Sequence, residues 1–534
     1  MARINGGKLV ARVLKQEGVE YIFALSGGEI DPIFQGCTDE GIKVIDTRHE
    51  QAAVFAAEGW AMMTGKPGIA AATAGPGFTN AVTGLWDAFG KACPIIVFGG
   101  RTGIQNFELG ALQDMNSLEL ASAITKWARA GYETKRIAEY VSMAFRQALG
   151  GRPGPVYLEF PVDVLNAEIE EDEVVLPTNY RTDARPQGDP EMVRQAVDIL
   201  LKAERPLVIG GMGLWWSQAA DELREFIELT GIPFSSSIGS SSLPADHPLC
   251  LNPRVGTDQA DAILVIGKRM DFLMAYGRAP QFNKDSKWIQ IDIEPTEIGR
   301  NRPIDIGIIG DAKAVLRQMS DEARDRCQGR KELPWVEQCH KLVMVQQEQM
   351  AGLMNSDSSP VHPARLCREI RDFLDRDATI VMDGGEISGW GFRVLRSYYP
   401  GHMLSILPTG TLGVGPSYSI AARLARPDNQ VLYLSGDGSF GLNAMEFNTM
   451  VRHNLPIVSI ISNDGSWGVI KRLQQNRGTG RVVGSDLGYV RYDKVVEALG
   501  GYGEAVDKPE DIRPALERAF ASGLPACINV RTSF

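Results

Sequence analysis

Short apolar runs alternate with amphipathic segments along most of the chain. The first block holds four runs of strand length: Tyr21–Leu25, Val44–Asp46, Ile69–Thr73 and Ile95–Phe98. A helix is expected between the second and third runs, from Glu50 to Gly65. Apolar residues recur there at helical spacing: Ala53, Ala56, Ala57 and Trp60. This alternation predicts a parallel sheet wrapped by helices.

Two further blocks repeat the pattern. The middle block has apolar runs at Pro206–Gly210, Ala262–Ile266 and Trp288–Ile293, with a helix expected over Gln218–Leu229. The third block has runs at Thr379–Asp383, Val431–Ser435 and Ile457–Ser462. Polar stretches near residues 168–190 and 320–360 separate the blocks. The sequence therefore predicts an α/β protein with three consecutive doubly wound parallel-sheet domains, at about 1–170, 190–320 and 360–534.

Composition narrows the class of protein. The 534 residues carry a formal charge of -11, which argues against nucleic acid as the main partner. No apolar run is long enough for a membrane helix, and the N-terminus lacks the apolar core of a secretory signal. The 7 cysteines are scattered and odd in number, which favours neither a disulfide framework nor a zinc site. We expect a reduced, cytoplasmic protein that acts on small molecules.

The third block carries a candidate phosphate and metal site. Gly436-Asp437-Gly438 closes one predicted strand, and Asn463-Asp464-Gly465-Ser466 closes the next. Glycine-rich backbone at a strand-to-helix turn suits a diphosphate, and side-chain oxygens suit Mg²⁺. Gly-Asp-Gly by itself also makes ordinary turns, but its spacing to the second motif favours the site.

Three other turns carry candidate contacts. Gly385, Ser388 and Gly389 follow a strand, where they suit either diphosphate oxygens or a plain strand exit. The loop Thr409–Gly415 places Leu412 among glycines, as a cofactor contact or as core. The turn Thr73–Phe78 fits either a ligand or a tight loop.

Together these motifs resemble those of thiamine diphosphate (ThDP) enzymes, and the resemblance covers the whole chain. It implies a pyrimidine-binding first block, a middle block and a diphosphate-binding third block. It also implies Mg²⁺ ligation by Asp437, the side chain of Asp464 and the carbonyl of Ser466. The family more often has Asn where Asp464 stands, which leaves Asn463 and Asp464 as alternatives for the second ligand.

The resemblance assigns the remaining cofactor contacts. Leu412 would separate the two cofactor rings, and the Gly410 carbonyl would accept from the pyrimidine amino group. The other expected contacts are Thr73, Gly75, Gly385, Ser388, Gly389, Gly436, Gly438, Ser439, Trp467 and Gly468. Glu50, by itself an ordinary acid at a helix start, would hydrogen-bond the pyrimidine nitrogen and so promote loss of the C2 proton. Since the first block serves a neighbouring chain in this family, the resemblance implies an obligatory homodimer and favours a homotetramer.

Within the family, several stretches resemble benzaldehyde lyase and the 2-hydroxyacyl-CoA lyases: residues 6–10, 45–50, 77–82 and 525–530. Gln113 stands where benzaldehyde lyase has a glutamine that contacts the substrate hydroxyl. Ser26 and Glu29 stand where that enzyme presents a histidine, so an imidazole proton shuttle is missing. The segments 214–217 and 297–303 also resemble the acyl-CoA lyases.

This likeness predicts cleavage of a 2-hydroxyacyl-CoA into an aldehyde or ketone and formyl-CoA, or the reverse condensation. Gln113, Glu29 and Ser26 would position the substrate hydroxyl. The middle block would bind ADP or CoA, with FAD or nothing as alternatives. Basic candidates for nucleotide phosphates are Arg254, Lys268, Arg269, Arg278, Arg300 and Arg302.

Three alternatives stay open. The chain stops just after its last strand, where acyl-CoA lyases continue into a closing segment, so either the sequence is short of that segment, or the pocket is open, or the substrate is not a CoA ester. A benzaldehyde lyase-like or acetolactate synthase-like carboligase on free acyloins or 2-ketoacids is the second enzymatic hypothesis. A ThDP-binding regulator without catalysis is the third, and it requires that Glu50 be misplaced.

Overall fold

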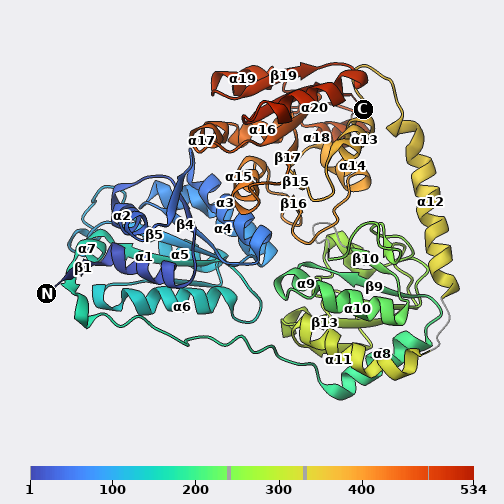
Figure 1. The fold of residues 1–534 in the computed structure, drawn as a ribbon, viewed down its shortest axis with the longest axis horizontal. Helices are drawn as coiled ribbons and strands as arrows, with labels where there is room; N and C mark the ends of the chain where they lie inside the picture. The colour runs from blue at the N-terminus through green and yellow to red at the C-terminus, as the bar shows by residue number, and fades with distance from the viewer. Residues whose placement is uncertain (1, 237–241, 329–332, 479, 534) are drawn as a thin grey trace.

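The computed structural model describes residues 2–236, 242–328, 333–478 and 480–533. Three six-stranded sheets follow one another along the chain, and their described strand pairs are all parallel. This confirms the predicted class of three consecutive parallel α/β domains. Figure 1 shows the first sheet in blue to cyan, the second in green to yellow and the third in orange to red.

The first sheet has the order β3-β2-β4-β5-β7-β6. Its strands are β2 (Tyr21–Ala24), β3 (Lys43–Asp46), β4 (Gly68–Ala72), β5 (Ile95–Arg101), β6 (Trp127–Ala130) and β7 (Val156–Pro161). Its main helices are α1 (Gly6–Gln16), α2 (Asp31–Asp39), α3 (Glu50–Thr64), α4 (Pro76–Lys91), α5 (Ser117–Ile124) and α6 (Ile137–Leu149). Separate apolar clusters lie on the two faces, with Phe23 and Val97 in one and Ile22 and Phe98 in the other. Burial on both faces explains why the strands read as continuous apolar runs.

The second sheet has the order β11-β10-β9-β12-β13-β14. Its strands are β9 (Pro206–Gly210), β10 (Phe234–Ser236), β11 (Cys250–Leu251), β12 (Ala262–Ile266), β13 (Lys287–Asp292) and β14 (Ile306–Ile309). The helices α8 (Pro190–Lys202), α9 (Met212–Trp216), α10 (Ala220–Thr230) and α11 (Ala312–Arg324) belong to this block. The polar stretch 320–360 contains a long exposed helix, α12 (Pro334–Met354), which runs from the second block to the third (Figure 1).

The third sheet has the order β16-β15-β17-β18-β20-β19. Its strands are β15 (Thr379–Met382), β16 (Met403–Ser405), β17 (Val431–Gly436), β18 (Val458–Asn463), β19 (Tyr502–Val506) and β20 (Ala526–Arg531). Its helices are α13 (Pro363–Phe373), α14 (Glu386–Val394), α15 (Gly415–Ala425), α16 (Asp437–Asn443), α17 (Glu446–Arg452), α18 (Gly468–Asn476), α19 (Tyr492–Ala498) and α20 (Ile512–Ala521). Ala444, Phe447 and Val451 recur at the spacing of one helix, but the chain forms two helices here, α16 and α17, with a break between them.

One apolar cluster joins the first and third blocks. Helix α3 packs against α15, and the Cα of Tyr418 comes so close that a Cβ on Gly59 would lie 3.0 Å from it. The first and third sheets contribute Val97 and Tyr433 to the same cluster. A separate short antiparallel pair joins β1 (Arg3–Asn5) to β8 (Glu168–Glu170). Among the described residues no helix is long and apolar enough to span a membrane.

Each sheet has a reversal point, where two neighbouring strands lead into connections that run in opposite directions, and ligands of such sheets bind beyond the carboxyl ends of the strands there. In the first sheet this point lies between β2 and β4, and in the third between β15 and β17. In the second sheet it lies between β9 and β12. The turn Thr73–Phe78 follows β4, Gly385 lies after β15 and Gly436–Gly438 lies at the end of β17, so these motifs lie at such points. Glu50 follows β3 and Asp464 follows β18, each one strand away.

Candidate active site

Glu50 begins helix α3, directly after the residue that caps the helix. His49 is the N-cap and accepts the Gln51 backbone N–H through Nδ1 at 3.1 Å. The Glu50 side chain is buried, with 6% of the residue exposed, and the Asn80 amide donates to it at 3.0 Å. Gly77 lies beside the same carboxylate, since a Cβ there would be 3.5 Å from Oε1 of Glu50. The carboxylate is therefore held in a defined orientation with one oxygen left for a ligand.

Thr73, which lies beside Gly77 as Glu50 does, is hydrogen-bonded to a second carboxylate. Its hydroxyl donates a short hydrogen bond to Glu29, which follows β2. Its side chain also packs closely against Gly27 and Gly77, where an added Cβ would lie 2.4 Å and 2.7 Å away. The structure thus brings Glu29, Thr73 and Glu50 together beside the reversal point of the first sheet. Ser26 is exposed at the same end of β2.

Gln113 reaches this group through its backbone. It has a positive φ of 60°, and Gly75, with φ of 54°, lies against it. A Cβ on Gly75 would be 2.8 Å from the Gln113 carbonyl, so only glycine fits. Asp114 accepts from the Glu108 backbone N–H at 2.8 Å and from Arg101 at 3.4 Å, and these bonds fix the loop.

Asp437 and Asp464 face each other beside the reversal point of the third sheet. Burial and the negative charge of Asp464 raise the pKa of Asp437 to about 7. The Oδ2 atom of Asp437 is buried and has no hydrogen-bond partner in the described part of the chain. Asp464 accepts from the backbone N–H and the hydroxyl of Ser466, both at 2.9 Å. Two facing carboxylates, one of which has an oxygen without a hydrogen-bond partner in the described residues, suit a divalent cation.

Asn463 has a different environment. It is fully buried, and its amide donates to the Val490 carbonyl at 2.8 Å and to Asn529 at 3.0 Å. Its side-chain oxygen accepts from the Gly465 backbone N–H at 3.1 Å. Since both ends of the amide are used inside the protein, Asp464 is the better placed of the two alternatives for a metal.

Glycines let the surrounding backbone approach closely. A Cβ on Gly438 would lie 2.6 Å from the Trp467 ring, and one on Gly468 would lie 2.5 Å from the Asp464 carboxylate. Gly385 has φ of 105°, and a Cβ there would lie 2.9 Å from the Cα of Gly436. These close approaches leave a small cradle of backbone beside Asp437, of the kind that binds phosphate.

Two serines that were expected to meet the diphosphate are bonded inside the protein. The Ser388 hydroxyl donates to the Asp383 carbonyl. The Ser439 hydroxyl donates to the Asp383 carboxylate and accepts from the Gly413 backbone N–H at 3.1 Å. Gly389, by contrast, is exposed with open space around its Cα.

Asp383 is a residue whose role the sequence analysis missed. Its fully buried carboxylate accepts the backbone N–H groups of Gly413 and Gly415 at 3.0 Å and 2.8 Å. Burial raises its pKa, although these hydrogen bonds oppose the shift. Its place directly after β15, beside two glycines, is the signal that marks it in the sequence.

The loop held by Asp383 carries Leu412 and Gly410. Leu412 is half-buried and lies outside the apolar clusters formed by the described residues. Its side chain covers Gly384, where a Cβ would lie 2.1 Å from Cδ2. Gly410 has φ of 75° and no neighbour within 4 Å of an added Cβ. A leucine presented on a glycine loop above the cradle is not a core residue, which favours the cofactor contact.

Within one chain, the segment that carries Glu50 contacts the third block close to Asp437. The Arg48 backbone N–H donates to Glu446 at 2.9 Å, and Asn443 donates to Gln51 at 3.4 Å. Among the described residues no hydrogen bond joins the Glu50, Thr73 and Glu29 group to Asp437 or Asp464.

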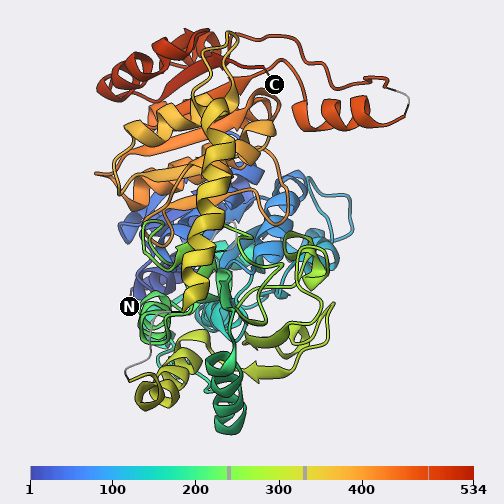
Figure 2. The same cartoon turned by 90° about the vertical axis from the view of Figure 1, so that its right-hand side faces the viewer.

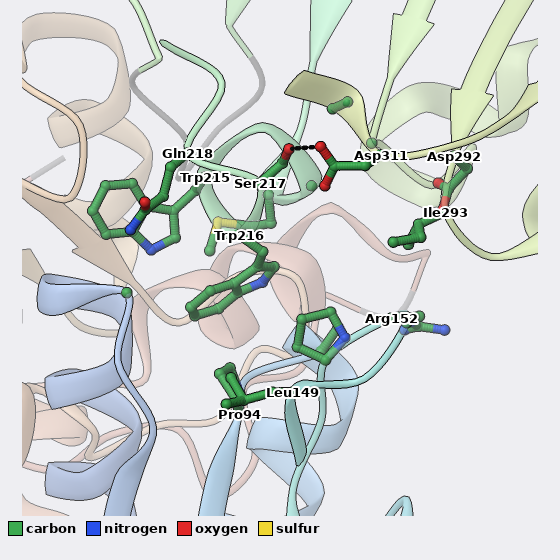
Figure 3. Close-up of a pocket in the computed structure, with 18 of the residues that line it drawn as sticks. Pro94, Leu149, Arg152, Trp215, Trp216, Ser217, Gln218, Asp292, Ile293 and Asp311 are labelled. Atoms are coloured by element: carbon green, nitrogen blue, oxygen red, sulfur yellow. Dashed lines mark hydrogen bonds between the residues drawn. The ribbon is translucent and has the colours of Figure 1, made fainter. Parts of the chain in front are cut away.

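A cavity of about 1130 Å³ lies at the reversal point of the second sheet. Trp215, Trp216, Arg152 and Asp292 line it (Figure 3). Its walls come from the second block, from the linker at residues 179–186, from the ends of α3, α4 and α6, and from the loop at residues 400–408. Gly211 and Gly213 pack against Gly267, where added Cβ atoms would lie 2.4 Å and 2.6 Å from its backbone.

The charges in this cavity are mixed. Arg185 pairs with Asp311 at 3.0 Å, and Lys268 lies 3.4 Å from Asp271. Burial raises the pKa of Asp292 to about 6. Of the basic residues chosen from the sequence, Lys268 and Arg269 line the cavity. Arg254, Arg278, Arg300 and Arg302 do not, which corrects that expectation: Arg302, for example, covers the Trp288 ring at 4.5 Å.

Three domain families match the chain, in the order that the fold displays. Residues 4–120 match the N-terminal TPP binding domain of thiamine pyrophosphate enzymes, residues 193–319 the central domain and residues 383–530 the C-terminal TPP binding domain. The chain belongs to the thiamine pyrophosphate enzyme family, and the protein is a ThDP-dependent enzyme.

Its relatives cover nearly the whole chain. A probable acetolactate synthase of Mycobacterium bovis is 36% identical over 99% of this chain and 96% of the relative. A 2-hydroxyacyl-CoA lyase of Arabidopsis thaliana is 33% identical over 99% of this chain and 95% of the relative. The human 2-hydroxyacyl-CoA lyase 2 is 32% identical over 99% of this chain and 91% of the relative.

Proposed function

We propose that this enzyme is a ThDP- and Mg²⁺-dependent carbon–carbon lyase and carboligase that cleaves a 2-hydroxyacyl-CoA into an aldehyde or ketone and formyl-CoA, or runs the reverse condensation. When bound, ThDP supplies a nucleophilic carbon that adds to a carbonyl and accepts the electron pair of the breaking bond. The observation that carries the proposal is the Glu29 carboxylate, hydrogen-bonded to Thr73 beside Glu50.

Glu29 discriminates between substrates by charge. A 2-ketoacid brings a carboxylate, which a second carboxylate repels in a partly buried pocket. Arg101 offers no compensation, since it is 3.4 Å from both Asp114 and Glu159. A thioester or a neutral acyloin has no such charge, and its hydroxyl donates well to a carboxylate. In cleavage this hydroxyl must lose its proton, and Glu29 accepts it while Gln113 and Ser26 position the oxygen.

The metal and diphosphate are assigned to the third block. Asp437, Asp464 and the carbonyl of Ser466 hold Mg²⁺ together with diphosphate oxygens. The backbone of three glycines faces the diphosphate: Gly385, Gly436 and Gly438. Four further residues lie nearby: Gly389, Gly468, Ser388 and Ser439. Trp467 packs over Gly438 and shapes the aldehyde pocket.

The pyrimidine side is assigned to the first block. Glu50 holds a proton at the pyrimidine ring nitrogen, and Asn80 keeps its carboxylate oriented by the 3.0 Å hydrogen bond. Thr73 and Gly75 line the ring, and Gly410 and Leu412 approach it from the third block.

We propose that a second copy of the chain completes the ThDP site, with the first block of one chain facing the third block of the other. Helix α18 projects from the body of the molecule (Figure 2) and contains no buried residue. Its apolar residues are largely exposed: Val469 45%, Ile470 49% and Leu473 47%. Exposed apolar faces of this kind mark interfaces. We assign a homodimer as the active unit, with pairing of dimers into a homotetramer.

Mixing two inactive variants tests this assignment. E50Q and D437N each remove one half of the site. The two variants are unfolded, mixed and refolded, so that mixed dimers form. A mixed dimer has one intact site only if that site takes Glu50 from one chain and Asp437 from the other. Activity of the mixture equal to the sum of the separate variants contradicts the shared site.

The central cavity is assigned to a nucleotide. Its volume of about 1130 Å³ suits ADP, the nucleotide part of CoA, or FAD. Trp215 and Trp216 offer ring faces, Lys268 and Arg269 offer charge for phosphates, and Asp292 offers an acceptor for a ribose hydroxyl. The absorption spectrum and mass of any ligand released from the purified protein separate flavin from adenine nucleotides. All seven cysteines are free, in accord with a cytoplasmic location.

An acetolactate synthase-like carboligase on 2-ketoacids, or a benzaldehyde lyase-like enzyme on free acyloins, is the second candidate, favoured by the 36% identical relative. A screen of 2-hydroxyacyl-CoA thioesters against benzoin and pyruvate, with ThDP and Mg²⁺ supplied, decides between them. Turnover of pyruvate or benzoin with thioesters left intact contradicts the CoA assignment.

A further inference from the structure

A buried cluster of charged side chains lies between the first and third blocks, beside the central cavity, which Lys91 also lines. Asp87 and Lys91 on α4 are joined by a 2.8 Å hydrogen bond, and Glu58 on α3 lies 3.4 Å from Lys91. The Tyr418 hydroxyl on α15 accepts from Lys91 at 2.6 Å and donates to Asp87 at 3.0 Å. The side chains of Glu58, Asp87 and Lys91 are almost fully buried.

Charge in the cluster is balanced. Burial and the negative charge of Asp87 raise the pKa of Glu58 well above its usual range, which favours its neutral form. Burial opposes ionisation of Asp87, but the positive charge of Lys91 lowers the pKa of Asp87 below its usual value. Asp87 is therefore a buried carboxylate paired with Lys91 on the same helix. Its other oxygen is available to a group of the third block.

That group is Thr409, the first residue of the loop that carries Gly410 and Leu412. The Thr409 hydroxyl donates a short hydrogen bond to Oδ1 of Asp87. The Thr409 methyl group lies against Gly90, where an added Cβ would be 2.3 Å from Cγ2. Both contacts come from α4, so the first block positions the start of this loop.

The other end of the loop is held from within the third block. Asp383 accepts the N–H groups of Gly413 and Gly415, and Asn443 donates to the Gly413 carbonyl at 2.8 Å. Gly410 and Leu412 thus stand between two anchors. Gly410 itself has a positive φ and open space around it, so its conformation depends on the anchors rather than on its own packing.

We propose that Asp87, acting through Thr409, is a positioning residue that sets the Gly410–Leu412 loop against the cofactor rings. The inference rests on the proposed cofactor role of Gly410 and Leu412. In this proposal Asp87, a residue of the first block, helps to position the Gly410–Leu412 loop of the third block. Its physical basis is a charge-assisted hydrogen bond in a buried place, where the donor is held strongly and an unpaired carboxylate oxygen is costly.

Thr409→Val tests the hydrogen bond with little change in shape. We expect the Kd for ThDP, measured by quenching of protein fluorescence with excess Mg²⁺, to rise about tenfold or more. The rate of C2 proton exchange in the bound cofactor should fall with it. Thr409→Ser keeps the hydroxyl and should restore both values. Gly90→Ala, which displaces the Thr409 methyl group, should reproduce the defect with the hydroxyl intact.

The outcomes separate this inference from the assignment of the site. If Thr409→Val lowers the melting temperature but leaves the ThDP Kd and the exchange rate at their wild-type values, Asp87 and Thr409 are structural and the inference is wrong. If Thr409→Ser is as defective as Thr409→Val, the hydroxyl is not the cause. If wild type binds ThDP but Leu412→Ala binds it equally well, the loop assignment itself fails.

Discussion

The Asn80 amide donates a 3.0 Å hydrogen bond to the Glu50 carboxylate, joining the first turn of α4 to the first turn of α3. Helix α4 follows β4 and helix α3 follows β3, two strands that lie on either side of β2, and Gly77 leaves space beside the same carboxylate. A buried carboxylate with one oxygen bonded and one free is suited to hold a proton on a ring nitrogen.

Replacing Glu50 by Gln should slow exchange of the C2 proton in bound ThDP by about 10²-fold to 10⁴-fold, because the amide cannot take up the proton. ThDP binding itself should persist, since the diphosphate is held by the third block. Proton exchange followed by NMR after acid quench measures the effect. Exchange as fast as in wild type contradicts the role of Glu50, and Asn80→Ala, which leaves the carboxylate in place, serves as the milder control.

Asp437→Asn should raise the Mg²⁺ concentration needed for ThDP binding by about tenfold or more, because a hard cation loses a charged ligand. Asp464→Asn keeps a side-chain oxygen and should bind the metal nearly as well as wild type, whereas Asp464→Ala should not. Mg²⁺ titrations read by ThDP-induced fluorescence quenching compare the three. An unchanged Mg²⁺ requirement in Asp464→Ala rules out Asp464 as a ligand.

Leu412→Ala should impair C2 proton exchange and weaken ThDP binding while costing less than about 2 kcal/mol of unfolding free energy, since the side chain is half-buried. Leu412→Met, with similar volume, should behave like wild type. Chemical denaturation and proton exchange measured on the same samples check both parts. A large loss of stability with normal exchange identifies Leu412 as an ordinary packing residue.

Glu29→Gln should slow cleavage of 2-hydroxyacyl-CoA by about 10²-fold or more, because the amide cannot accept the hydroxyl proton. The same change removes a negative charge, so KM for pyruvate should fall if pyruvate is turned over at all. Steady-state kinetics with both substrates give the comparison, and Ser26→Ala, which leaves the carboxylate in place, should slow cleavage less than Glu29→Gln does. Equal rates for Glu29→Gln and wild type contradict the proposed base.

Glu446 should make stability depend on pH near neutrality. Burial raises its pKa to about 7, so the folded state binds this proton more tightly than the unfolded state does. The free energy of unfolding therefore falls as pH rises from about 4.5 to 7, and Glu446→Gln should flatten that part of the profile. Melting temperatures between pH 5 and 8 test this, and a variant profile parallel to that of wild type contradicts it.

Many residues of the candidate site could be predicted from the sequence, because the turns that carry them are marked by short, local sequence patterns. A glycine turn after an apolar run marks a strand end wherever the strand pairs, so Gly436–Gly438 and Thr73–Gly77 needed no tertiary information. The same holds for the three-block organisation, since strand and helix periodicities are properties of short segments. The split between α16 and α17 was not visible, because Ala444 and Phe447 keep helical spacing across the break.

The sequence by itself determined the class of fold, the residue types at the strand ends and their likeness to ThDP enzymes. Tertiary structure decided which of these residues meet: that Asn463 is turned inward while Asp464 faces Asp437, and that Thr73 is bonded to Glu29. It also placed Asp383 and Asp87 against the two ends of the Thr409–Gly415 loop. The partners in these hydrogen bonds lie far apart along the chain, so the sequence alone did not indicate them. Hydrogen bonds between distant segments depend on how the sheets and helices pack, and no local pattern encodes that packing.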